Sequence, residues 1–285
     1  MANSIASRVY RDKYRAATLD RTLRGAMVAS DIVAKDTSNN FRILSPYSST
    51  PTVTVQALAG TYSPADWTTT DDTLTVTDEF IIGEHIFDWE ESLTNFNLFA
   101  DRTEQAAFAV AKKIDEFVLN NLLEDGTASY TTPAGGFTTA ANINTIFANI
   151  NSILGGYAES YQGNMFVVIE NTDLVGLVAA GATNGFNFAD GVLNNGKVGQ
   201  WMGVDIYVVR AGTFTDATVG TKTWTNAGHR VAGVKRVATM AMPGGIKFEE
   251  KQVSGKTGME LATYGYIGFK LWAPKTALII DITLA

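Results

Sequence analysis

Residues 101–123, DRTEQAAFAVAKKIDEFVLNNLL, form the stretch of the sequence that decides the fold. Their apolar residues recur at three- and four-residue spacing, which places them on one face of an α-helix. Asp101 is expected to cap the first turn together with Glu104, and Gly126 is a natural stop. A helix of this length spans roughly 35 Å, which is long for a compact domain. We expect a rod on which the chain is built; an ordinary core helix is the alternative.

Length and composition describe a globular chain. Its 285 residues can bury a core as one large domain or two smaller ones. No apolar run approaches the length of a membrane-spanning helix, so we expect no contact with a membrane, and we expect no secretory signal at the start. The chain contains no cysteine, which excludes thiol catalysis, disulfides and cysteine-ligated metals.

Charge is distributed unevenly along the chain. The net charge is −7, and residues 1–24 contribute +4, from six basic and two acidic residues, so the remainder carries −11. This pattern is not typical of a dedicated nucleic-acid binder. It fits a basic arm that lies on an acidic neighbour or faces a polyanion weakly, and a solvated tail is the alternative. The basic residues of the arm are Arg8, Arg11, Lys13, Arg15, Arg21 and Arg24.

Residues 46–82 predict a long β-hairpin. Apolar residues alternate with threonine or glutamine at 52–56 and at 73–77, as in half-exposed strands. The stretch between them contains glycine, proline and adjacent aspartates, which favour turns. Because an isolated hairpin is marginal in water, we expect it to lean on another subunit. Tyr62 and Trp67 near its tip are the candidate anchors.

The rest of the chain mixes helices and strands without a repeat or linker, which predicts the α+β class. The expected elements are a buried strand at 80–89, a helix at 143–154, a central strand at 165–170, a short helix at 171–180 capped by Asn171 or Thr172, a strand at 201–210, and a strand-rich carboxyl terminus.

A search for chemistry finds no supported site. Residues 191–197 have the spacing of a phosphate-binding loop, but Val198 replaces the hydroxyl residue and a strand-like segment follows. His85 and His229 have no second histidine at ligand spacing. Pairs of adjacent acidic residues occur at 71–72, 90–91 and 249–250, but they lack the spacing of a calcium-binding loop, and carboxylates alone do not indicate a glycosidase. We therefore predict no enzymatic activity and no catalytic, cofactor-binding or metal-binding residues.

The order of these parts resembles the major capsid (coat) protein of tailed double-stranded DNA bacteriophages, the Hong Kong 97-like fold. AFAVAKKIDEFVLNNLL, at residues 107–123, is similar to that family's alanine-rich helix ending in I-D-x-x-x-L. GQWMGVDIYVVR, at 199–210, resembles its recurring glycine-bearing strand, and MELATYGYIGFKLWAPKTALIID, at 259–281, resembles its Y-G-x-x-hydrophobic-x-x-P ending. The resemblance covers nearly the whole chain at the level of layout.

The resemblance implies four parts: an N-terminal arm at residues 1–45, an extended loop at 46–82, a peripheral domain at 83–138 and 229–285 with its spine helix at 101–123, and an axial domain at 139–228. It implies a structural protein of the virion, assembled in the host cytoplasm, whose pentamers and hexamers form an icosahedral shell around the genome. The partners it implies are further copies, a portal, and scaffolding or decoration proteins, with only weak non-specific contact to packaged DNA.

The expected contacts between subunits and the expected hinges follow from this layout. The contact candidates are Arg8, Arg11, Arg15, Arg21, Arg24, Tyr62, Asp66, Trp67, Asp71 and Asp72. The hinge candidates, which bracket the movable parts, are Gly60, Gly83 and Gly126.

Three other functions remain open from the sequence. An encapsulin-like nanocompartment shell would share these features but enclose a protein cargo. A β-rich carbohydrate-binding or hydrolytic domain, suggested by the threonine, tryptophan and acidic content, would be a monomer. A phage tail or baseplate protein would form rings or tubes.

The lysine positions make one prediction about mature particles. Some members of the resembled family crosslink their subunits through a lysine in the extended loop and an asparagine on a neighbour. Residues 46–82 contain no lysine, so this route is closed. We predict that mature particles give a single monomer band on a denaturing gel. A ladder of oligomers would contradict the prediction.

Overall fold

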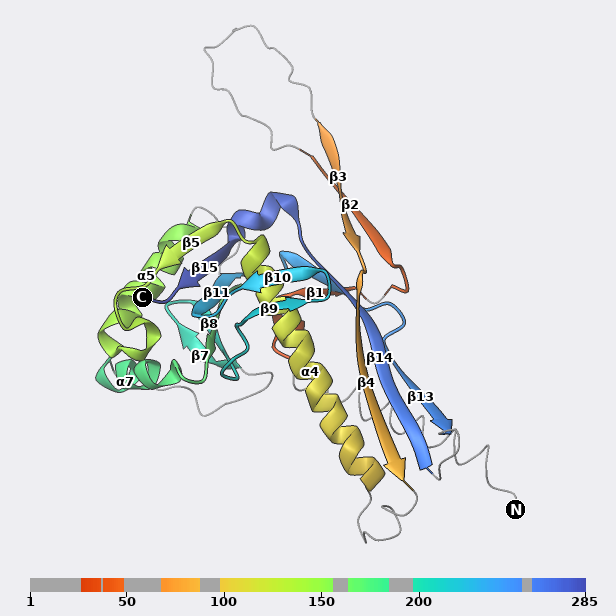
Figure 1. Cartoon of the computed structure of the whole chain (residues 1–285). Helices are drawn as coiled ribbons and strands as arrows, with labels where there is room; N and C mark the ends of the chain where they lie inside the picture. The colour runs from red at the N-terminus through yellow and green to blue at the C-terminus, as the bar shows by residue number, and fades with distance from the viewer. Residues whose placement is uncertain are drawn as a thin grey trace, which may run out of the picture.

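One long helix runs between two sheets of different shape, and a hairpin projects from the body (Figure 1). The computed structural model describes residues 27–36, 38–48, 68–87, 98–155, 164–184, 197–252 and 258–285. The mixture of helix and strand is the expected α+β class. Among the described residues, no helix has both the length and the apolar character needed to cross a bilayer.

The long helix α4 spans Leu98–Asp125 and contains the whole predicted segment. Its predicted apolar face is buried, with Val110, Ile114 and Val118 almost inaccessible to solvent. The expected cap was wrong, because the helix begins three residues earlier and Asp101 therefore lies inside it. The periodicity that defines the apolar face carries no information about where the polar first turn starts.

The first sheet has six strands and forms the centre of the core. Every residue of its central strand β6 is buried, so the sheet is covered on both faces, as the sequence predicted for residues 165–170. The helices α5 (Ala140–Leu154) and α7 (Leu174–Asn184) pack against each other beside it. Its strands lie in the order β5 (Ala128–Thr131), β15 (Ile279–Thr283), β11 (His229–Val234), β6 (Met165–Glu170), β8 (Val204–Val209) and β7 (Lys197–Trp201).

The single strand predicted at residues 201–210 is in fact part of a hairpin. β7 and β8 pair antiparallel, and Met202 and Gly203 form the turn between them with φ values of 50° and 84°. Two consecutive positive φ values are the mark of the tight turns that join twisted strands. The prediction located β8 but missed the turn before it, because Met202 is not a typical turn residue.

The second sheet is built around the long strand β14 (Gly258–Leu271). Pairing along β14 places β4 against residues 258–267, β13 against 259–265 and β12 against 268–271. The short strand β1 adds in parallel to β12. The strands are β1 (Ala34–Asp36), β4 (Asp78–Phe87), β12 (Ala238–Ala241), β13 (Ile246–Gln252) and β14 (Gly258–Leu271).

The strand expected at residues 80–89 is present as β4, but it is not buried. Its residues alternate between exposed and half-buried, and the side chain of Ile81 is 67% exposed. The apolar run FIIGEHIF suggested a strand covered on both faces. In the described part of the chain, one face of β4 has no covering layer.

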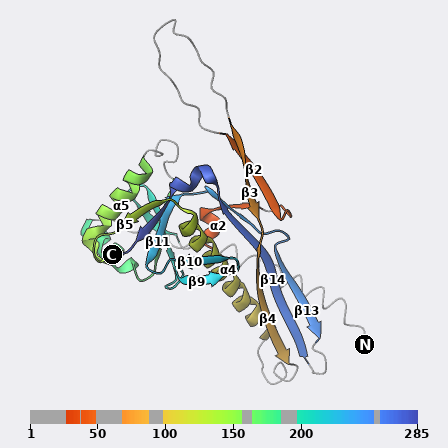
Figure 2. The same ribbon diagram turned by 45° about the horizontal axis from the view of Figure 1, so that its top comes forward.

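The projecting hairpin consists of β2 (Arg42–Ser48) and β3 (Thr69–Thr75), which pair antiparallel from Arg42 opposite Thr75 to Ser48 opposite Thr69. Both views show it extending away from the body (Figures 1 and 2). The strand predicted at residues 73–77 overlaps β3. The other strand, β2, ends before the strand predicted at residues 52–56. The residues at 52–56 lie outside the described part of the chain.

Smaller elements complete the body. The hairpin of β9 (Asp216–Val219) and β10 (Lys222–Thr225) packs on α4, where Trp224 Nε1 donates to Asn121 Oδ1 at 3.1 Å. The remaining elements are α2 (Ala29–Ile32), η1 (Gly136–Thr138) and η3 (Ala273–Leu278).

The six-stranded sheet contains strands from both the expected axial domain and the expected peripheral domain. Its strands β6, β7 and β8 come from the segment expected to be axial, whereas β5, β11 and β15 come from segments expected to be peripheral. β11 and β6 pair directly, although the expected boundary falls between residues 228 and 229. The division into domains therefore remains a prediction, and the sheet itself is continuous across its boundary.

Candidate functional site

Most of the predicted contact residues lie outside the residues that the structure describes. The two expected contact residues within it, Asp71 and Asp72, are neighbours on β3. Those that lie outside are Arg8, Arg11, Arg15, Arg21, Arg24, Tyr62, Asp66 and Trp67.

Asp72 has its partners within its own chain. Its carboxylate lies 3.1 Å from Lys270 Nζ and accepts hydrogen bonds from the N–H groups of Ala273 and Thr73. Burial opposes ionisation of Asp72, but the hydrogen bonds from Ala273 and Lys270 outweigh it and lower its pKa. Asp72 thus ties the base of the hairpin to β14, whereas Asp71 is exposed and its role between subunits remains a prediction.

The two described hinge candidates have different surroundings. Gly83 lies within β4 opposite Ala262, and a Cβ there would meet nothing within 4 Å. Gly126 follows α4, donates to Leu122 O at 3.1 Å, and would place a Cβ 3.0 Å from Ile279 Cγ2. Close packing is therefore one reason for glycine at 126. Movement at either position remains a prediction, and Gly60 lies outside the described residues.

An apolar groove of about 290 Å³ lies where α4, β4 and the β9–β10 hairpin meet. We call it the α4–β4 groove. Its apolar lining consists of Phe80, Ile81, Ile114, Phe117, Val219 and Ile267, and Asp78, Glu79 and Lys113 also border it. No single stretch of sequence indicates this groove, because its lining comes from separate elements.

Other large apolar side chains are also exposed. Two of them, Val175 and Val178, lie one helical turn apart on α7 and are 70% and 51% exposed. Contiguous exposed apolar surface on a soluble chain commonly marks an interaction site. The others are Phe41, Leu44, Phe108 and Met202.

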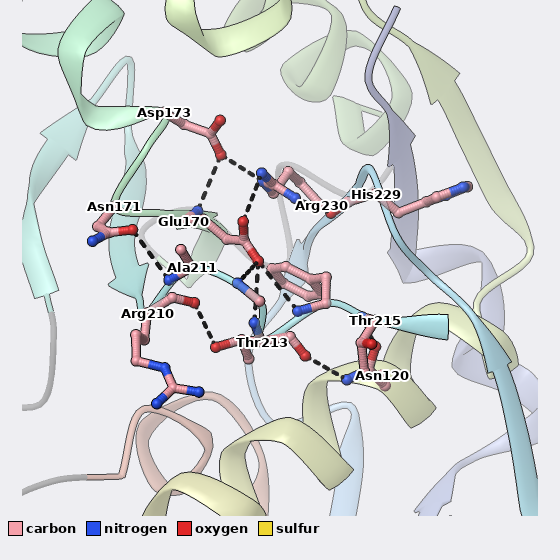
Figure 3. A network of polar contacts seen from close by, with 12 residues as sticks. Asn120, Glu170, Asn171, Asp173, Arg210, Ala211, Thr213, Thr215, His229 and Arg230 are labelled. Atoms are coloured by element: carbon pink, nitrogen blue, oxygen red, sulfur yellow. Dashed lines mark hydrogen bonds and ion pairs between the residues drawn. The ribbon is translucent and has the colours of Figure 1, made fainter. Parts of the chain in front are cut away.

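A buried ionic network fixes one end of the six-stranded sheet (Figure 3). Glu170, the last residue of β6, accepts the N–H groups of Gly212, Thr213 and Phe214 with Oε1. Its Oε2 accepts from Arg230 of β11 at 3.1 Å, and Asp173 Oδ2 accepts from Arg230 Nε at 2.5 Å. Arg230 is only 5% exposed. Its charge is therefore matched by two carboxylates in a setting from which water is largely excluded.

The network continues to α4. Asn120 Nδ2 donates to Thr213 O at 2.8 Å, so the loop after β8 joins the long helix to the ends of β6 and β11. Asn171 Oδ1 accepts from Ala211 N at 3.1 Å, and α7 begins only at Leu174. The predicted cap by Asn171 or Thr172 was therefore wrong, because Asn171 is used to join two strand ends.

Sequence reasoning missed this network. The only local signals are an acidic residue that closes the apolar run MFVVIE and an arginine inside the strand HRVAGV. Their partnership spans 60 positions. The network joins β6, β11 and the loop after β8. His229, one of the two histidines, has its Nδ1 2.7 Å from Asp281 Oδ1. Within the described ranges, no three His, Cys, Asp or Glu side chains are grouped to hold a metal ion.

Comparison with solved structures identifies the fold. The capsid structure of Cyanophage P-SCSP1u matches with a TM-score of 0.66 and 14% identity, over 92% of this chain and 89% of that chain. The mature capsid of bacteriophage PhiM1 matches with a TM-score of 0.66 and 11% identity, over 92% and 86%. Mycobacterium phage Che8 matches with a TM-score of 0.62 and 17% identity, over 85% and 84%.

The chain therefore has the fold of phage capsid proteins, which confirms the fold that the sequence resemblance implied. No family model and no curated protein sequence matches the chain. At identities this low, the likeness establishes the fold alone.

The ionic network leads to a prediction about stability. Replacing Arg230 with methionine leaves the Glu170 and Asp173 carboxylates buried without their cation. We expect Arg230→Met to lower the free energy of unfolding by about 3–5 kcal/mol. Lys222→Met removes the half-exposed pair with Asp125 and should cost less than about 1 kcal/mol. Urea denaturation of both variants measures the difference, and equal losses would show that the network is not a stabilising centre.

Proposed function

We propose that this chain is a major capsid protein, a structural protein of the virion that self-assembles into the icosahedral shell of a phage. The observation that carries the proposal is the fold shared with capsid proteins over about nine-tenths of the chain. In this proposal the shell consists of pentamers and hexamers, forms in the host cytoplasm and encloses double-stranded DNA. The chain acts by association with further copies of itself and not by catalysis.

Features of the described residues support association. The β2–β3 hairpin projects from the body (Figures 1 and 2). The α4–β4 groove offers apolar surface. A stable assembly requires burial of about 2,000 Å² or more per subunit. Burial of groove and hairpin surface between neighbours would contribute to that area.

We propose that the hairpin of one subunit lies across the α4–β4 groove of the next, with Trp67 and Tyr62 as its apolar anchors. The groove is lined mainly by aliphatic and aromatic side chains, which suit such anchors. The basic arm would lie on acidic residues of a neighbouring β4, β13 or β14. Candidate acidic partners there are Glu79, Glu249 and Glu260.

Other partners follow from the same proposal. A shell that is filled with DNA requires a portal. Scaffolding proteins would assist its assembly, and decoration proteins would cover its outer surface. The acidic body would contact packaged DNA only weakly and without sequence preference, because few phosphates would be neutralised.

The alternative functions are less well supported. Two of the three structural matches given above are phage capsids, which does not favour an encapsulin-like compartment. Their fold gives no support to a carbohydrate-binding domain. Copurifying DNA and a portal, as opposed to an enclosed enzyme, would distinguish the first alternative. Rings or tubes in place of closed shells would indicate a tail or baseplate protein.

Electron microscopy of the expressed chain tests the assembly function. We expect closed shells from the full chain. Replacing residues 50–67 with a short turn keeps the β2–β3 pairing and the Asp72–Lys270 contact but removes the hairpin tip, so we expect folded, unassembled protein. Circular dichroism would verify that the shortened variant is folded. Normal shells from it would rule out the proposed role of the tip.

A charge placed in the groove tests where neighbours meet. Ile81 is 67% exposed, so Ile81→Glu should change the stability of the single chain by less than about 0.5 kcal/mol. In an assembled shell the same carboxylate would be buried among apolar side chains, and we expect shells to be lost. Ser129→Glu adds equal charge at an exposed position on β5 and should preserve assembly. Light scattering measures both, and intact shells from Ile81→Glu would exclude the groove.

A further inference from the structure

Residues 27–36 join three separate parts of the molecule. We call them the amino-terminal strap; they comprise Met27, Val28, α2, Val33 and β1. The strap contacts α4 through Asp115, the six-stranded sheet through Tyr207, and the five-stranded sheet through the pairing of β1 with β12. Its helix has only four residues and cannot be stable alone. The conformation of the strap therefore depends on what holds it.

Asp115 of α4 holds the beginning of the strap. Its carboxylate accepts the N–H of Ala29 at 2.8 Å and that of Val28 at 3.1 Å. These N–H groups belong to the first turn of α2, and the first N–H groups of a helix have no carbonyl acceptor within the helix. Asp115 is only 8% exposed. The attachment is therefore made by a carboxylate that has been almost entirely removed from water.

A second group of polar side chains holds the middle of the strap. Tyr207 of β8 donates to Asp31 Oδ2, and Lys235 Nζ donates to Tyr207 OH at 2.6 Å and to Asp205 Oδ2 at 2.7 Å. Lys197 of β7 also pairs with Asp205 at 2.8 Å. In addition, Arg236 N, which follows β11, donates to Ile32 O. The strap is thus attached to the six-stranded sheet at Asp31 and Ile32, and its pairing with the five-stranded sheet begins at Ala34.

We propose that the amino-terminal strap is a releasable clamp between the two sheets and that Asp115 is the positioning residue that sets how firmly it is held. In a shell, copies of one chain must fit unequal surroundings, and a clamp of this kind would limit how far the sheets can turn relative to each other. The proposal itself concerns the single chain and does not depend on assembly.

The charges around Asp115 make this clamp sensitive to pH. Burial raises the pKa of Asp115 to about 7, against the opposing effect of the hydrogen bonds from Ala29 and Val28. A cavity of about 320 Å³ lies beside the carboxylate, and Lys112 of the same helix and Arg210 after β8 also line it. Neither forms an ion pair with Asp115 among the described residues, and Figure 3 shows the side chain of Arg210 directed away from the ionic network.

The sign of the pH effect follows from linkage. With the strap attached, Asp115 binds a proton more tightly than an exposed aspartate, whose pKa is about 3.9. Acid therefore favours attachment, and the attachment weakens as pH rises toward 7. Above 7 the carboxylate is ionised in both states, and the effect levels off. The strap is held least firmly in alkaline solution.

Hydrogen exchange on the unassembled chain tests the clamp. After correction for intrinsic rates, we expect the protection of residues 28–36 to fall about tenfold between pH 6 and pH 8. Asp115→Asn should abolish this pH dependence, and Glu116→Gln, the adjacent carboxyl, should retain it. Asp115→Ala should expose the strap at both pH values and leave β6 protected. Unchanged protection in the wild type, or equal loss in β6, would overturn the proposal.

The angle between the sheets can be measured directly. Because the chain has no cysteine, spin labels can be attached at Ser129→Cys on β5 and Glu249→Cys on β13, both exposed. We expect a narrow distance distribution at pH 6 and a broader one at pH 8. Adding Asp115→Ala should broaden it at both pH values. A distribution that this variant leaves narrow would show that the strap does not fix the sheets.

Discussion

The burial of one face of α4 is the interaction on which the rest of the structure depends. Both sheets, the β9–β10 hairpin and the amino-terminal strap contact this helix. Its apolar face supplies part of the core, and its polar residues Asp115, Asn120 and Asn121 hold neighbouring segments by hydrogen bonds. A change in the direction of the helix would therefore be transmitted to each of these parts.

Elements with a strong local pattern could be predicted from the sequence. A periodic apolar face predicted α4 and α5, and an uninterrupted apolar run predicted β6. These predictions are possible because the burial of a regular element shows in the pattern of neighbouring residues. Features that depend on distant partners could not. The turn at Met202 and Gly203 has methionine, which is not a typical turn residue, at its first position. The first strand of the projecting hairpin contains Pro46, which suits only an edge strand.

The candidate site shows the same division. The sequence indicated a projecting hairpin and an unequal charge distribution, both of which are properties of continuous segments. The α4–β4 groove could not be foreseen, because Phe80, Ile114 and Val219 meet only in the folded chain. Arg230 and Glu170 are likewise 60 positions apart, and Asp115 acts on an amide 86 positions before it. Contacts of this kind are set by the topology of the sheets.

The contact between Asp72 and Lys270 gives the hairpin a mechanical connection to the core. Lys270 lies near the end of β14, and the chain continues from there through η3 into β15 of the six-stranded sheet. Tension applied to the hairpin would reach the five-stranded sheet directly, because β3 is followed along the chain by β4. It would also reach the six-stranded sheet through Asp72, whose partners Lys270 and Ala273 precede β15 by about ten residues or fewer. The hairpin is therefore a lever whose load is shared by the two sheets.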